Sequence, residues 1–272
     1  MSAVDSASPA TAPRAGASPR SLGRSPAAIS VGSVLVAGLL WEFLGRQFPA
    51  TASYPSAVGA ALIEITVGDG ALVSALADTL RGMAAGFLVA SVLGVAIGFA
   101  MGRIPVVAGL VEPYINAIYA TPRIALIPLL VLWFGIGFQL RVTVAVLTAI
   151  FPIILNTYVG ASSVDGGLMD AGRSLNANSL QLLRTVVMPA SLPFVVTGLR
   201  IGGFRALVGV IVAEMTASIT GTGQLLLTYG RFLQIPHLIA AILSLGVIGV
   251  VFTQLMGAAE RAAMPWARQR RA

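Results

Sequence analysis

Long apolar runs alternate with short polar segments along this chain. Each run holds about the 20 residues that an α-helix needs to cross roughly 30 Å of hydrocarbon. A barrel strand would instead alternate apolar and polar positions with a period of two. The pattern therefore predicts an all-α polytopic membrane protein, since helices satisfy their own backbone groups in lipid. About six transmembrane helices are expected, over residues 27–44, 80–101, 104–134, 140–160, 190–216 and 236–259.

One polar segment, residues 169–189, is too ordered to be a simple loop between two such runs. It carries Arg173 and Arg184, and we interpret it as two short helices on the membrane surface. A feature of this kind can dock a soluble partner, although an amphipathic surface helix without a partner is the alternative. The segment suggests a membrane protein that is driven from one side by another protein.

The third apolar run is too long for one straight crossing and is interrupted at Thr121, Pro122 and Arg123. Proline lacks an N–H donor and clashes with the preceding turn, so we expect a kinked or discontinuous helix there. Broken helices at membrane depth commonly line a cavity. Thr121 and Arg123 are therefore candidates for a translocation pathway. The alternative for Arg123 is that it only contacts lipid headgroups near the membrane interface.

Glu214 lies deep in the fifth apolar run, nine residues after Arg205. A carboxylate in lipid is costly unless it faces a partner, water or a cavity. Nine helical residues span about 13 Å, which is too far for a direct pair with Arg205 without a bend. Two interpretations stay open for Glu214: a satisfied structural carboxylate, which is favoured, and a gate or pathway residue.

Small residues recur every four positions in the second apolar run, and this spacing makes one stripe on a helix. Such a stripe lets another helix approach closely, because packing contacts drive helix association in lipid. Packing within one chain is favoured over a dimer seam. The stripe consists of Gly82, Gly86, Ala90, Gly94, Gly98 and Gly102.

Composition supports a membrane protein and removes several functions. The 272 residues are 57% hydrophobic and only 10% charged, outside the range of soluble domains. All 17 basic residues are arginine, and without lysine the chain has no P-loop for ATP. With no cysteine and one histidine, it offers no disulfide, thiolate nucleophile or clustered metal site. We expect no enzymatic activity, no cofactor and no nucleic acid partner.

The net charge of +7 is interpreted as orientation in the membrane, because arginine-rich short loops stay in the cytoplasm. Both termini are then cytoplasmic. The domains expected are a disordered basic tail over 1–27, a transmembrane domain over 28–260 and a second basic tail over 261–272. A cleaved signal peptide is the alternative for the N-terminus. The outer loops keep three clearly placed arginines: Arg46, Arg141 and Arg231.

Several stretches match one family in the same order. Asp170-Ala171-Gly172, then Asn176, then Val187-Met188-Pro189 resemble the cytoplasmic Glu-Ala-Ala loop of permease subunits of binding-protein-dependent ABC importers. Residues 121–137, 151–158 and 198–214 look like the nitrate, sulfonate and taurine group of these permeases. The resemblance covers nearly everything from about residue 30 onward.

The resemblance implies a type I importer-like permease fold with a coupling loop at about 165–189. In the family this loop sits in a groove of a cytoplasmic ABC ATPase and transmits its closure to the transmembrane helices. Asp170 takes the place of the usual glutamate, and Asn176 replaces the usual glycine between the two short helices. Asparagine is among the non-glycine residues that best tolerate the left-handed backbone conformation. The residues implied in ATPase coupling are Asp170, Ala171, Gly172, Asn176, Leu180, Leu183 and Pro189.

The implied assembly is a permease homodimer in membrane lipid of the bacterial inner membrane, with two ATPase subunits and an extracytoplasmic solute-binding protein. The implied solute is small and anionic or polar, such as a sulfonate or nitrate. The main alternative is a gradient-driven secondary transporter. Inverted repeats in the sequence would favour it, and no convincing internal duplication is evident. A membrane scaffold without transport is the third reading.

Overall fold

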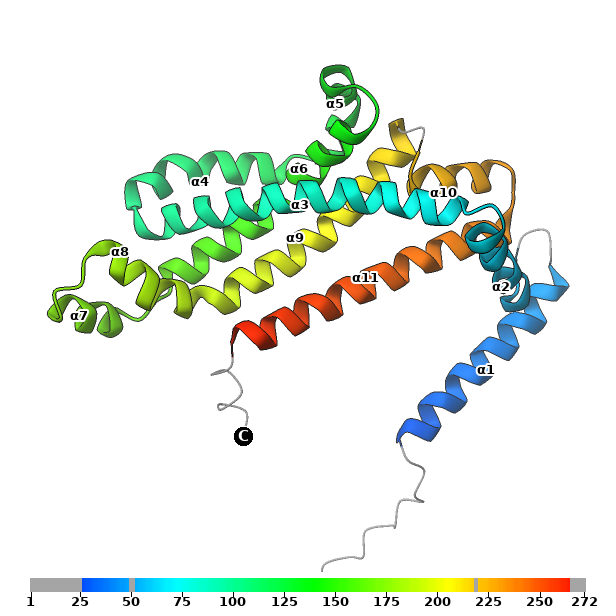
Figure 1. Ribbon diagram of the computed structural model, residues 1–272, viewed down its shortest axis with the longest axis horizontal. Helices are drawn as coiled ribbons and strands as arrows, with labels where there is room; N and C mark the ends of the chain where they lie inside the picture. Colours follow the sequence, from blue (N-terminus) through cyan, green and yellow to red (C-terminus); the bar gives the residue numbers. More distant parts are fainter. Residues whose placement is uncertain (1–25, 49–51, 218–219, 265–272) are drawn as a thin grey trace, which may run out of the picture.

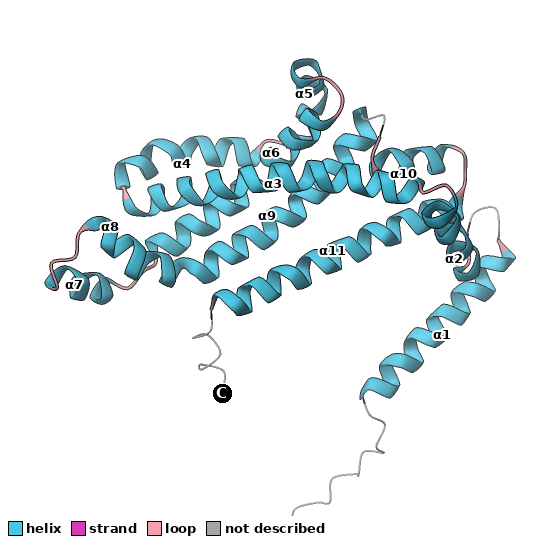
Figure 2. Cartoon of the chain, viewed as in Figure 1, coloured by secondary structure: helices cyan, strands magenta, loops and turns pink. Residues whose placement is uncertain are grey.

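A computed structural model describes residues 26–48, 52–217 and 220–264, and every regular element in them is helical (Figures 1 and 2). Of the two tails expected at 1–27 and 261–272, only residues 26–27 and 261–264 are described; α1 begins at Pro26 and α11 continues to Ala263, and the rest of both tails lies outside the described residues. Three short segments are helical but not α-helical: π-helical turns at Glu64–Gly68 and Leu183–Val187, and a 3₁₀ turn at Arg123–Leu126. The α-helices are α1 (Pro26–Gln47), α2 (Pro55–Ile63), α3 (Ala71–Arg103), α4 (Pro105–Ala120), α5 (Ile127–Phe134), α6 (Phe138–Ser162), α7 (Gly166–Ser174), α8 (Ser179–Leu182), α9 (Met188–Ala217), α10 (Thr222–Arg231) and α11 (Ile235–Ala263).

Five of the helical stretches described are long and apolar enough to cross a membrane, and a bent pair brings the number to six. Each predicted apolar run coincides with one of them, so the predicted all-α polytopic architecture is confirmed. The second span is longer than predicted. Helix α3 begins at Ala71 rather than near residue 80, because a polar turn with Ser74, Asp78 and Thr79 extends it beyond the apolar run.

Helices α3, α6 and α9 form the packed centre of the molecule, joined by buried small and aliphatic side chains. The small-residue stripe of α3 faces α6 along its whole length. A Cβ built on Gly86 would lie 2.4 Å from the Cβ of Ala145, and a Cβ built on any other glycine of the stripe would lie 2.5–2.8 Å from an atom of α6. Only a hydrogen fits at this distance, so the stripe serves packing within the chain, as favoured from the sequence.

The interruption predicted in the third apolar run is present. Helix α4 ends at Ala120, a 3₁₀ turn follows at Arg123–Leu126, and α5 leaves at an angle of 85° to α4. Pro122 favours an extended conformation in the residue before it, and Thr121 has φ −74° and ψ 135°. One proline at this position therefore accounts for the end of α4.

Short helices lie at opposite ends of the long ones (Figure 1). Helices α7 and α8 occupy one end, and α2 and α10 the other, where they pack on the beginnings of α3 and α11. Neither α2 nor α10 was predicted from the sequence, since they are only nine and ten residues long.

The helix predicted over 190–216 has no break before it: α9 begins at Met188, directly after another helical turn. Helix α8 does not end before the next span but continues through the turn Leu183–Val187 into α9, which makes one helical stretch over 179–217. That turn is a π-helix, and it ends just before Pro189, whose missing N–H would interrupt a regular α-helical ladder.

Candidate functional site

The segment predicted to dock a partner is built from two capped helical turns. Asp165 begins α7 by accepting a hydrogen bond from the backbone N–H of Leu168 at 3.1 Å. Asn178 and Gln181 form a reciprocal capping box at the start of α8. Between the two helices, Asn176 has φ 56°, the left-handed conformation that asparagine tolerates better than other side chains except glycine. Local sequence therefore dictates this turn.

The inner face of the segment is a small apolar core of Ala161, Met169, Leu182 and Val187. Leu183 packs against this core as a half-buried residue. Gly172 also faces inward, since a Cβ there would lie 2.4 Å from Cδ2 of Leu182. A larger residue at position 172 would thus have to displace the end of the Leu182 side chain.

The outer face of the segment presents other residues of the expected loop pattern. Asp170 and Ala171 are exposed, and Asp170 forms an exposed ion pair with Arg173 at 3.1 Å. Leu175 is 84% exposed and Leu180 is 54% exposed. A polar helix tip flanked by two exposed leucines is a surface suited to a protein partner.

A cavity of about 740 Å³ lies beside the break between α4 and α5, against α9 and α11. Thr121 and Arg123, both predicted as pathway candidates, are among its lining residues. Arg200 and Arg205 of α9 also line it, and neither was among the predicted pathway residues. The complete lining is Thr121, Pro122, Arg123, Ile124, Thr148, Arg200, Ile201, Phe204, Arg205, Val208, Gly209 and Thr253.

Two of the cavity arginines are held in place by other side chains. The guanidinium carbon of Arg123 lies 4.9 Å from the ring centre of Tyr119 and 5.3 Å from that of Phe151, so two aromatic faces position it. Arg200 forms an ion pair with Glu260 of α11. The cavity is therefore a preformed space with oriented cationic groups.

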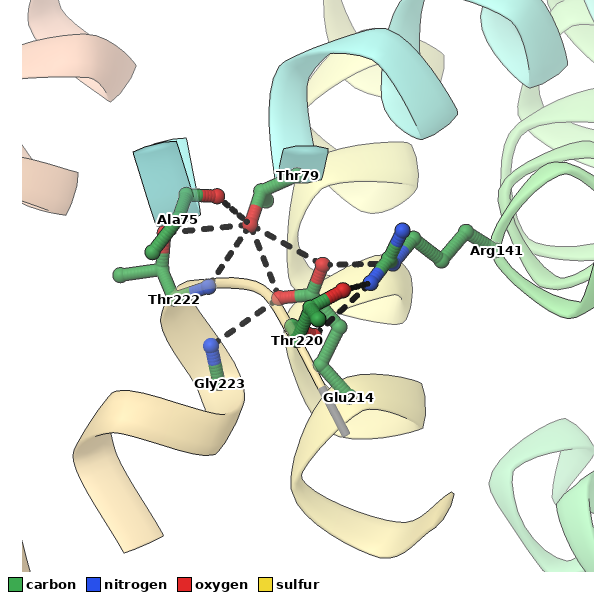
Figure 3. Close-up of polar contacts among 7 residues, drawn as sticks. All are labelled: Ala75, Thr79, Arg141, Glu214, Thr220, Thr222 and Gly223. Carbon is green, nitrogen blue, oxygen red and sulfur yellow. Dashed lines mark hydrogen bonds and ion pairs between the residues drawn. The ribbon is translucent and has the colours of Figure 1, made fainter. Parts of the chain in front are cut away.

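Glu214 does not line this cavity but lies in a fully buried polar cluster (Figure 3). Its Oε1 is 3.0 Å from Nε of Arg141 on α6. The hydroxyl of Thr79 on α3 lies within 3.0 Å of both carboxylate oxygens. The backbone N–H of Gly223, in the first turn of α10, donates to Oε2 at 3.0 Å. The carboxylate is thus paired and hydrogen-bonded from three other helices.

Residues 220–223, which lead into α10, fit around that carboxylate. A Cβ at Gly221 would lie 2.1 Å from Oε1 of Glu214, and Gly221 has φ 104°. The backbone N–H of Thr222 donates to Thr79, and Arg141 donates to the carbonyl of Thr220. The cluster fixes the first turn of α10 to the three central helices.

Arg141 departs from the prediction. It was predicted in an outer loop, whereas it is 5% exposed in the first turn of α6 and pairs with Glu214. Apolar patterning could not find the pair, since its members are 73 positions apart. Arg141 follows the apolar Leu140 directly, and Gly221-Thr222-Gly223 is the only local signal of a tight turn near Glu214.

Comparison with known proteins adds to this geometry. The model of the family described as "Binding-protein-dependent transport system inner membrane component" matches residues 90–264. The taurine transport system permease protein of Escherichia coli is 32% identical over 73% of this chain and 72% of its own length. A probable ABC transporter permease protein of Brucella abortus is 31% identical over 73% of this chain and 79% of its length.

A more distant likeness concerns a Bacillus subtilis protein described as a putative aliphatic sulfonates transport permease, 30% identical over 67% of this chain and 66% of its length. Among solved structures, a chain of the MetNI methionine ABC transporter in an inward-facing conformation matches with a TM-score of 0.59 at 22% identity. That match covers 71% of this chain and 94% of the other. At this identity the match shows the fold.

Proposed function

The chain belongs to the family of inner membrane components of binding-protein-dependent transport systems, and we propose that residues 165–189 couple it to a cytoplasmic ABC ATPase. It is a multi-pass ABC importer permease of the taurine and sulfonate type, with the helical fold of such permeases. It is a transport component and not an enzyme, and its family implies ATPase and binding-protein partners. A gradient-driven transporter is not favoured.

The observation that carries the coupling proposal is the arrangement of the loop. Its inner face is packed on Met169 and Leu182, and its second helix continues without a break into α9. A push on the exposed residues Asp170 and Ala171 therefore reaches α9 through a rigid, packed unit. The same helix α9 carries Arg200 and Arg205 to the cavity.

The proposal extends to the orientation of the chain in the membrane and to the class of solute. The α7–α8 end faces the cytoplasm, and α2 and α10 face the binding protein, which makes both termini cytoplasmic. Two copies of the chain pair in the lipid, and the cavity with Thr121 and Arg123 belongs to the pathway. A small anionic or polar solute, such as a sulfonate or nitrate, suits a cavity lined by arginines. Glu214 acts as a positioning residue outside the pathway.

An Ala171→Arg variant tests the coupling. Ala171 is exposed next to Asp170, so a large cation there blocks a close partner without disturbing the core of the loop. ATP-driven uptake by the reconstituted importer, and recovery of the ATPase with the permease, are expected to be lost. Ala171→Ser is the matched control and is expected to retain both. Normal uptake by Ala171→Arg would refute the coupling assignment.

A further inference from the structure

The cavity carries an excess of positive charge. Arg123, Arg200 and Arg205 line it, and the only carboxylate that the described structure pairs with any of the three is Glu260. Arginines in the membrane interior are costly, and they pair with carboxylates or carbonyls or mark ion and substrate pathways. One carboxylate does not neutralise three guanidinium groups, so the cavity favours an additional anion.

Unpaired hydrogen-bond donors on these arginines also favour an anion in the cavity. Nη1 of Arg123 and Nε of Arg200 are buried and have no acceptor among the described residues. Buried donors in native proteins are nearly always satisfied, and leaving one unmade costs about 1–3 kcal/mol. Guanidinium groups bind planar or tetrahedral oxyanions through two parallel N–H bonds. An oxyanion supplies the acceptors that these two guanidinium groups lack.

Glu260 already occupies part of this donor set. Its Oε2 lies against Nη2 of Arg200. Glu260 follows Thr253, a cavity-lining residue, by seven positions on α11, so both lie on about the same face of that helix. The two side chains of the pair remain 41% and 38% exposed, so the pair is reachable from outside the core. An anion that enters the cavity meets Arg200 with its counter-ion attached.

We propose that Arg123, Arg200 and Arg205 form an oxyanion site in the cavity, and that Glu260 is its built-in counter-ion, which the bound anion displaces from Arg200. The proposal rests on the cavity being part of the pathway. Without an anion, Glu260 neutralises Arg200. With an anion present, the two compete for the same guanidinium group. The return of Glu260 then weakens anion binding and promotes release.

The test uses the purified permease–ATPase complex and two probes of similar shape. Methanesulfonate carries the charge, and dimethyl sulfone is its neutral analogue. Thermal unfolding at constant ionic strength reports binding, because a ligand of the folded state raises the midpoint. Methanesulfonate is expected to raise the midpoint of the wild-type complex, and dimethyl sulfone is not. Equal shifts by both probes, or no shift by methanesulfonate, would overturn the oxyanion site.

Variants test the counter-ion. In Glu260→Gln the competitor is gone, so the methanesulfonate concentration for half-maximal shift is expected to fall about tenfold, as when a competent state rises from a tenth to full population. Arg205→Gln is expected to lose the shift while leaving the Arg200–Glu260 pair intact. Glu112→Gln on α4 and Arg81→Gln on α3 remove like charges away from the cavity and are expected to bind as wild type.

The outcomes separate this inference from the coupling proposal. If Glu260→Gln binds methanesulfonate no more tightly than wild type, the counter-ion role is wrong. If the wild-type complex hydrolyses ATP and supports uptake but Arg205→Gln retains the full shift, the arginine site is wrong while the permease assignment stands. If no ATPase is recovered with the wild-type chain, the coupling proposal itself fails.

Discussion

Removing one member of the buried Glu214–Arg141 pair should destabilise the protein strongly. The side chains are 0% and 6% exposed, so the charge left behind has no access to water. Glu214→Gln keeps a carbonyl oxygen for the N–H of Gly223 and the hydroxyl of Thr79. Its effect therefore isolates the unpaired guanidinium group of Arg141. Breaking a buried pair in this way costs about 3–5 kcal/mol.

The expected loss is large enough to measure by thermal unfolding of the purified permease. For a chain of this size, about 1 kcal/mol corresponds to a shift of roughly 2–4 °C, so Glu214→Gln should lower the midpoint by about 6–20 °C. Arg173→Gln breaks the exposed pair with Asp170 and should change the midpoint little.

A double variant gives the sharper result. Glu214→Gln combined with Arg141→Met removes both charges, and replacing a buried pair by uncharged groups is often nearly neutral. The loss in the free energy of unfolding of the double variant should therefore be smaller than the sum of the two single losses, by about 1.5 kcal/mol or more. Strictly additive losses, or a Glu214→Gln variant as stable as wild type, would refute the idea that the pair is what holds α10 to the central helices.

Two further predictions concern packing and the turn of the coupling loop. Gly86→Ala places a methyl group 2.4 Å from the Cβ of Ala145, so unfolding should become easier by about 1–3 kcal/mol; Gly59→Ala, with nothing within 4 Å, is the control, and equal behaviour of the two variants would contradict the packing account. Asn176→Val forces a β-branched residue into φ 56° and should cost about 1–2 kcal/mol, whereas Asn176→Gly should be tolerated; equal midpoints in thermal unfolding would contradict this.

Much of the fold follows from local patterns in the sequence. The spans, the break at Pro122 and the close face of α3 on α6 depend on local signals: run length, a proline and glycines at every fourth position. The left-handed residue Asn176 was likewise anticipated, because it depends on the intrinsic preference of one side chain.

The missed features depend on contacts between distant parts of the chain. Glu214 was expected to need a partner, but the partner is Arg141 on another helix, and the hydroxyl of Thr79 comes from a third. Arg200 was not among the predicted site residues, yet it lines the cavity and pairs with Glu260, 60 positions away. The fusion of α8 with α9 was missed because a π-turn lets a helix continue up to a proline that normally begins a new one.

Site-directed cross-linking tests the central claim most directly, because the chain contains no cysteine of its own. Ala171→Cys introduces a single thiol at the exposed tip of α7, and Ala60→Cys introduces one on an exposed position of α2 at the other end. With a short thiol-to-amine cross-linker, the account predicts that Ala171→Cys joins the permease to the ATPase subunit and that Ala60→Cys does not. An intact complex in which Ala171→Cys gives no cross-link, or in which both positions give the same one, would contradict it.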